Sequence, residues 1–233
     1  MPLTRTISEA FSDWVTSFAV PRAKLIPSTY VPPPKKGRWG LHNAVIKTEA
    51  DIQMLFGSFL NNWLSAEPAS GEDSNERDGQ CLAVHSEMTY PKRLFPPGTV
   101  SRSSIAIDLS VYGYRCQRPI YDDVNQAELF SNARALIEVK YLPWVAPGFH
   151  LKHIGALMKD IDSLAIVANE VVRRNHAPKP SLFHLILDEG FYCSGAGFNP
   201  AERIALKQLH AAHAEHGIVC LSNNQNICGT CGP

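Results

Sequence analysis

The chain has 233 residues, of which 45% are hydrophobic, enough to bury the core of one domain. Its 22 Lys and Arg residues balance 22 Asp and Glu residues. No overall field therefore favours nucleic acid, membranes or acidic partners, and any nucleic-acid site must be a local patch. The sequence has no signal-peptide pattern and no apolar run near the roughly 18 residues of a membrane span. We therefore expect a cytoplasmic protein with no membrane partner.

The N-terminal region combines an amphipathic segment with a proline-rich one. Residues 6–20 predict a helix, with Thr6 and Glu9 at capping-box spacing, and residues 21–40 predict an extended arm. These segments could mediate contacts in a homodimer. Two parts are therefore predicted: the helix and arm over residues 1–42, and a single globular domain over residues 43–233.

The rest of the chain alternates between strand-like and helical patterns. Residues 65–80 carry charged and turn-forming residues and predict a loop. The order of elements indicates an α/β fold with a mixed sheet and helices on its faces. Helices are expected over residues 49–64, 151–174 and 200–215, and strands over 81–88, 105–110, 135–141, 181–187 and 217–221.

Two of the apolar strands carry ionisable residues. Side chains alternate across a strand, so Glu138 and Lys140 should share one face of the strand over residues 135–141. Asp108 is the one acid in the strand over residues 105–110. If these strands pair with their polar faces together, the three side chains form a cluster. Two carboxylates suit Mg²⁺, and a nearby lysine can orient a water molecule.

This order of elements, with a lone Asp108 and then Glu138-Val139-Lys140, resembles the PD-(D/E)XK nucleases, the restriction-endonuclease-like superfamily. The resemblance covers about residues 43–187. It implies a restriction-endonuclease-like mixed central sheet flanked by helices. It also implies that Asp108 and Glu138 bind Mg²⁺, with Mn²⁺ as a second candidate ion, and that Lys140 contacts the attacking water. The domain over residues 43–233 would then be a nuclease-like domain.

The same resemblance implies a further acid at the metal site, for which the sequence offers two candidates. Glu49 begins the first helix of the domain, where an acid also complements the helix dipole. Glu87 ends the strand over residues 81–88. Either residue could equally be an exposed charge at the end of an element.

Other charged residues have a purely structural interpretation as well as a functional one. Lys152 and Lys159 on the long helix could contact phosphate, whereas Asp160 and Asp162 are expected on its wet face. Glu-x-Lys on a strand is often only a solvated pair. The long connection over residues 113–133 departs from the short turn that is frequent in the superfamily, and it puts the pairing of the Asp108 strand in doubt.

The cysteines and histidines point to no metal site. Cys228 and Cys231 have the spacing of half a zinc site, but the other cysteines are scattered singles, which are more often buried thiols. Zinc is therefore not expected, and the thiols should be reduced. The nine histidines show no spacing that converges with the acids.

Three functions follow from these residues. The first is a Mg²⁺-dependent endonuclease that hydrolyses phosphodiester bonds, with DNA favoured over RNA as substrate. The second is a catalytically inactive nucleic-acid-binding or scaffold protein on the same fold. The third is an unrelated α/β protein in which Glu138 and Lys140 are surface charges.

Overall fold

The computed structural model of the protein describes residues 3–19, 49–66, 80–115, 130, 132–142, 150–175, 179–188 and 198–222. The proline-rich arm, Cys228 and Cys231, and most of the connection over residues 113–133 lie outside these ranges.

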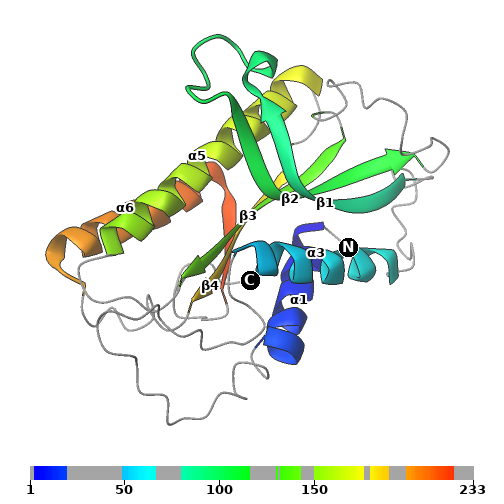
Figure 1. The fold of residues 1–233 in the computed structure, drawn as a ribbon, viewed down its shortest axis with the longest axis horizontal. Helices are drawn as coiled ribbons and strands as arrows, with labels where there is room; N and C mark the ends of the chain where they lie inside the picture. The colour runs from blue at the N-terminus through cyan, green and yellow to red at the C-terminus, as the bar shows by residue number, and fades with distance from the viewer. Residues whose placement is uncertain are drawn as a thin grey trace.

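The described chain folds into five strands and four α-helices (Figure 1). Helix α1 continues into the short π-helical turn η1 over Val15–Ala19, and a single 3₁₀ turn, η2, covers Lys92–Leu94. The helices are α1 (Leu3–Trp14), α3 (Glu49–Ala66), α5 (His150–Asn175) and α6 (Pro200–His216); the strands are β1 (Gln80–Pro91), β2 (Ser104–Arg115), β3 (Ala133–Leu142), β4 (Ser181–Asp188) and β5 (Ile218–Ser222).

The five strands form one mixed sheet in the order β1-β2-β3-β4-β5. Strand β2 is antiparallel to both β1 and β3, whereas β3, β4 and β5 run parallel. Helices α5 and α6 lie between the parallel strands along the chain, as parallel neighbours require. The sheet confirms the predicted α/β class, with a mixed sheet flanked by helices. Strand β2, which carries Asp108, pairs with β3, which carries Glu138, so the doubt raised by the long connection between them is removed.

Helices cover both faces of the sheet, each over its own hydrophobic core. Helices α1 and α3 pack on one face, where Phe11 and Trp14 meet Phe56 at centroid distances of 5.7 and 5.4 Å. Helices α5 and α6 pack on the other face. Figure 1 shows these two helix pairs on opposite sides of the sheet. The N-terminal helix is therefore part of the packed domain.

Helix α6 has well-defined ends. Asn199 and Glu202 form a capping box: each side chain accepts a hydrogen bond from the other residue's backbone N–H, at 2.9 and 2.8 Å. The helix ends at Gly217, whose φ of 64° is left-handed and favours glycine. These signals place β5 directly after the helix.

The sheet forks between β2 and β3. The paired residues of these two strands end at Leu109 and Ile137. Beyond this pair β2 continues beside β1 as far as Ser104, while β3 continues beside β4 as far as Leu142. Two strands that part in this way leave backbone groups and side chains available in the gap. Asp108 is the first residue of β2 past the last pair.

At the fork, the side chains of strand β2 also switch from one face of the sheet to the other. Ile107 belongs to the core beneath α5, whereas Leu109 belongs to the core beneath α3. Residues two apart in a regular strand share a face, so the strand is irregular at Asp108. On β1, Glu87 lies between the partners of these two residues and therefore faces Asp108 across the ladder. Its φ of 52° is left-handed, which is uncommon for a residue with a side chain.

Candidate active site

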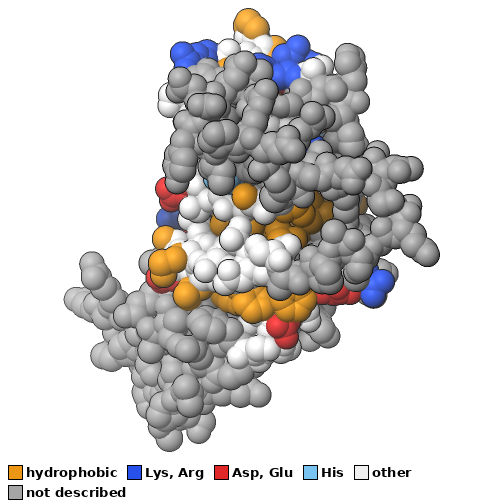
Figure 2. Space-filling model, turned by 90° about the vertical axis from the view of Figure 1, so that its right-hand side faces the viewer, with side chains coloured by type: hydrophobic (Ala, Val, Ile, Leu, Met, Phe, Trp, Pro, Cys, Tyr) orange, Lys and Arg blue, Asp and Glu red, His pale blue; other side chains and the backbone are white. Residues whose placement is uncertain are grey.

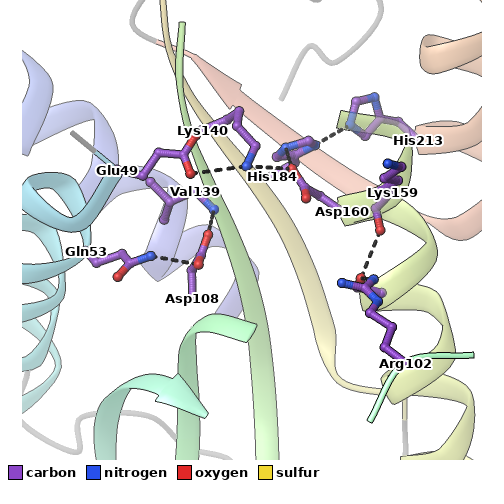
Figure 3. A network of polar contacts seen from close by, with 11 residues as sticks. Glu49, Gln53, Arg102, Asp108, Val139, Lys140, Lys159, Asp160, His184 and His213 are labelled. Atoms are coloured by element: carbon purple, nitrogen blue, oxygen red, sulfur yellow. Dashed lines mark hydrogen bonds and ion pairs between the residues drawn. The ribbon is translucent and has the colours of Figure 1, made fainter. Parts of the chain in front are cut away.

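Asp108 occupies the fork between β2 and β3. One carboxylate oxygen, Oδ2, accepts a hydrogen bond of 2.8 Å from the backbone N–H of Val139, which has passed the last β2 partner. The other oxygen, Oδ1, accepts a hydrogen bond of 2.7 Å from Nε2 of Gln53 on α3. The carboxylate is thus held from both sides. Figure 3 shows it between α3 and β3.

Glu138 follows Ile137 on β3 and is the residue opposite Asp108 when the ladder is extended by one pair. It is only 5% exposed. Burial, followed by the charges of Asp108 and Asp160 and a hydrogen bond with the Asp108 carboxyl group, raises the pKa of Glu138 well above its usual value. The structure therefore brings two carboxyl groups together and disfavours the charged form of Glu138.

Lys140 lies two residues beyond Glu138 on β3, and its ammonium group lies between two further carboxylates. Nζ is 3.3 Å from Oε2 of Glu49 and 3.2 Å from Oδ2 of Asp160 (Figure 3). Burial alone would lower the Lys140 pKa, but Asp160 and Glu49 outweigh it and raise the pKa. The amine is therefore a protonated, fixed cation rather than a free base.

The wet-face expectation for Asp160 is wrong. Its helix, α5, is rotated so that this side chain points to the sheet and pairs with Lys140, while Asp162, two positions on, is exposed. The expectation that no histidine converges with the acids is also wrong. His184 on β4 pairs directly with Glu138 in the β3–β4 register, and its Nε2 is 3.7 Å from Asp160 Oδ2.

A second buried histidine stands behind the first. His213 on α6 places Nε2 3.0 Å from Nδ1 of His184 (Figure 3). Burial, with smaller effects from His184 and His210, lowers the pKa of His213 to about 3, so His213 is neutral at physiological pH. A buried N–H without an acceptor is costly. Because Nδ1 of His213 has no partner among the described residues, its proton belongs on Nε2, which donates to His184. The other nitrogen of His184 can then carry a proton toward Asp160.

The remaining predicted site residues lie apart from the lysine. Glu87 is exposed in the middle of β1, because that strand extends to Pro91 rather than ending at Glu87 as expected. Lys152 and Lys159 are exposed on α5. Of the two candidate acids, the structure brings only Glu49 to Lys140. The pKa of Glu49 is raised, chiefly by burial, against the opposing effect of Lys140.

Gln53 is a site residue that the sequence analysis missed. It lies four residues after Glu49 on α3, so the two side chains share a helix face directed at the fork. That i, i+4 spacing of Glu49 and Gln53 on one helix face is the signal that could have found it. The amide holds Asp108 while the carboxylate holds Lys140.

A groove of about 430 Å³ opens beside this site, between α3 and β1. Gln53 lines it, so the groove adjoins the carboxylate that Gln53 binds. Its other walls combine polar side chains, such as Asn61 and Ser86, with apolar ones, such as Met54 and Leu109. A polar chain could approach Asp108 from this side.

The two carboxyl groups at the fork suit a hard cation that needs only one or two ligands from the protein. Among the described residues, no group of three or more His, Cys, Asp or Glu side chains is arranged to hold a metal ion. Mg²⁺, however, is commonly bound by one or two carboxylates, with water and substrate oxygens as its other ligands. The buried Glu138 beside Asp108 fits this requirement, because a nearby cation would favour the charged form of Glu138.

Comparison of the chain with family models, curated proteins and solved structures finds no match. Within the part of the chain that the structure covers, none of the helices is both long and apolar enough to cross a membrane.

Proposed function

We propose that this protein is a metal-dependent nuclease of the PD-(D/E)XK superfamily, which hydrolyses phosphodiester bonds in DNA with Mg²⁺ or Mn²⁺. The observation that carries the proposal is the fork, where Asp108 and the buried Glu138 meet and Lys140 is fixed beside them. The antiparallel and then parallel strand order supports a restriction-endonuclease-like fold.

Asp108 and Glu138 would hold the metal ion in this proposal. A bound Mg²⁺ lowers the pKa of a water molecule and neutralises charge on a phosphate. Asp108 is preorganised for this role because Gln53 and the Val139 backbone fix its orientation. Glu138 gains its charge when the ion binds, since burial and Asp108 otherwise favour its neutral form.

Lys140 acts as a positioned cation. Glu49 and Asp160 keep its amine protonated, so it stabilises negative charge and orients a water molecule rather than removing a proton. The β3 backbone and the two carboxylates together limit the movement of Nζ. The groove beside Gln53 gives a nucleic-acid strand a route to these groups.

A second candidate is a catalytically inactive nucleic-acid-binding or scaffold protein on the same fold. The specific observation in its favour is that both oxygens of Asp108 already accept hydrogen bonds, from Gln53 and Val139. Such bonds satisfy the carboxylate without a metal. The two functions differ in whether divalent ions bind at the fork and whether DNA is cut.

Cleavage of plasmid and linear DNA with Mg²⁺ or Mn²⁺ tests the proposal. Cutting should be lost in Asp108→Asn and in Lys140→Met, and kept in the control Asp162→Asn, which removes an exposed acid of the same helix as Asp160. Mn²⁺ should also raise the melting temperature of the native protein but not that of Asp108→Asn. Neither cutting nor this metal-dependent shift would leave the inactive binding protein as the better account.

A further inference from the structure

The connection between β1 and β2 forms a basic tip. We define the tip as residues 92–103, which contain Lys92, Arg93 and Arg102 but no acid. All three side chains belong to exposed residues. No carboxylate among the described residues pairs with any of them. In a chain with no net charge, this segment is a local concentration of positive charge.

The tip is anchored to the domain rather than hanging free. Leu94, Phe95 and Val100 are buried in the core beneath α5. The backbone N–H of Lys92 donates to the Ser103 carbonyl at 2.8 Å, which closes the base of the tip. Such anchoring fixes the position of the exposed cations, so a partner need not order the segment on binding.

Two arginine contacts join the tip to α5. Arg102 donates to Oγ of Ser163 at 2.9 Å (Figure 3). From the end of α5, Arg174 donates to the Leu94 carbonyl and also pairs with Glu170. Arg173 pairs with the same carboxylate and is exposed. The tip and the end of α5 thus carry five cations, two of which pair with Glu170.

These cations gather at one end of the molecule. Figure 2 shows Lys and Arg side chains grouped at the top, the end where the β1–β2 connection and the last turns of α5 lie in Figure 1. Arg102 is six residues before Asp108. At about 3.3 Å per residue the two lie at most about 20 Å apart, or about six base-pair steps of duplex DNA.

We propose that the basic tip, with the end of α5, binds the phosphate backbone of a duplex DNA whose scissile phosphate lies at the fork. The partner is duplex DNA because it is the substrate of the proposed nuclease, and a duplex is long enough to reach both the fork and exposed cations at most about 20 Å from it. Exposed guanidinium groups can each hold a phosphate through two hydrogen bonds. The inference rests on the proposed function for its partner, but binding at the tip does not require cleavage.

Fluorescence anisotropy of a labelled 30-base-pair duplex, without divalent ions, at 50–200 mM salt, tests this surface. The variant Lys92→Gln/Arg93→Gln removes two cations from the tip. Arg5→Gln/Lys207→Gln is the matched control, because it removes two exposed cations from α1 and α6. Thermal unfolding of both variants checks that they are folded.

The tip variant should bind about 10- to 60-fold more weakly at 100 mM salt, and the slope of log K against log salt should fall by up to about 1.8. The control should match the native protein. Equal weakening in both variants overturns the inference, as does binding of the native protein to phosphatidylserine vesicles but not to duplex DNA. If DNA binding depends on the tip but no metal-dependent cutting occurs, this inference holds and the nuclease proposal is rejected. If the protein cuts DNA but binding does not depend on the tip, the nuclease proposal holds and this inference is rejected.

Discussion

Buried ionisable groups have different surroundings in the antiparallel and the parallel halves of the sheet. At the fork between β2 and β3, Glu138 meets a second carboxyl group, and burial disfavours its charge. In the parallel half, His184 and His213 hydrogen-bond to each other between β4 and α6, and burial lowers the pKa of His213 to about 3, which keeps His213 neutral. The first arrangement opposes the charge of Glu138, whereas the second joins its two rings by a hydrogen bond. The fork therefore has the features of a ligand site, and the histidine pair those of its support.

The largest expected effect comes from Glu138→Gln. In the proposed nuclease this change removes one of two metal-binding carboxylates, and cleavage should fall by about a thousandfold, roughly 4 kcal/mol of transition-state stabilisation. Rates with Mg²⁺ and Mn²⁺ measure it, with Asp162→Asn as control. A variant that cuts DNA at near-native rate would remove Glu138 from the chemistry.

The same variant should be more stable than the native protein above pH 5. The raised pKa means that folded Glu138 binds its proton more tightly than unfolded Glu138, so the native protein loses stability as pH rises through and above the ordinary carboxyl value. A neutral Gln avoids that loss, which is on the order of 1 kcal/mol or more. Urea unfolding at pH 4 and pH 8 should show the difference only at the higher pH.

A second, smaller effect on rate is expected at His184. Its ring faces Asp160, and Asp160 holds Lys140, so His184 acts as a positioning residue. His184→Ala should lower kcat by about 10- to 100-fold, or about 1.4–2.7 kcal/mol, and leave KM unchanged. His184→Gln, which keeps a donor, should recover part of the loss. His216→Gln serves as the control, and an equal loss in both Ala and Gln variants would indicate damage to packing rather than to positioning.

How far the sequence predicted this site depends on the kind of element. Alternation along a strand was sufficient to place Glu138 and Lys140 on one face and to suggest their meeting with Asp108. The contacts of Asp160 and His184 depend on the rotation of α5 and on the register of β3 with β4. Neither quantity leaves a local pattern in a single sequence. An aspartate in a helix with several charged positions looks the same whether it faces water or a lysine.

The position of the end of β1 explains why the prediction for Glu87 was wrong. The apolar pattern fades near Met88, so Glu87 was expected at the end of a strand. In the structure β1 continues to Pro91, and Thr89 and Tyr90 still pair with β2. The pairing with β2, rather than local composition, extends the strand. The left-handed backbone at Glu87 lies opposite the irregular position of β2 at Asp108, and no pattern in the sequence marks either irregularity.

His213, the second ring of the histidine pair, gives an effect on stability rather than on rate. His213 is held neutral with a pKa of about 3, so the folded state binds fewer protons than the unfolded state as pH falls below about 6.5. That difference should steepen the acid loss of stability by up to about 1.4 kcal/mol per pH unit between pH 6 and pH 4. His213→Gln should flatten the slope in urea unfolding, while His216→Gln should keep it. An unchanged slope in His213→Gln would mean that burial in the folded state does not oppose protonation of this ring.

The smallest effect is expected at Glu87. It tests whether the left-handed backbone there affects only stability or also DNA cleavage. Left-handed backbone costs a residue with a side chain about 1 kcal/mol, which glycine avoids. Glu87→Gly should therefore raise the free energy of unfolding by about that amount, and Glu87→Gln, which keeps the strain, should not. Both should cut DNA within about twofold of the native rate, because Glu49 rather than Glu87 reaches Lys140. If both variants lose cutting, the Glu87 carboxylate belongs to the metal site despite its exposure; if only the glycine variant loses it, the left-handed backbone holds Asp108 in place.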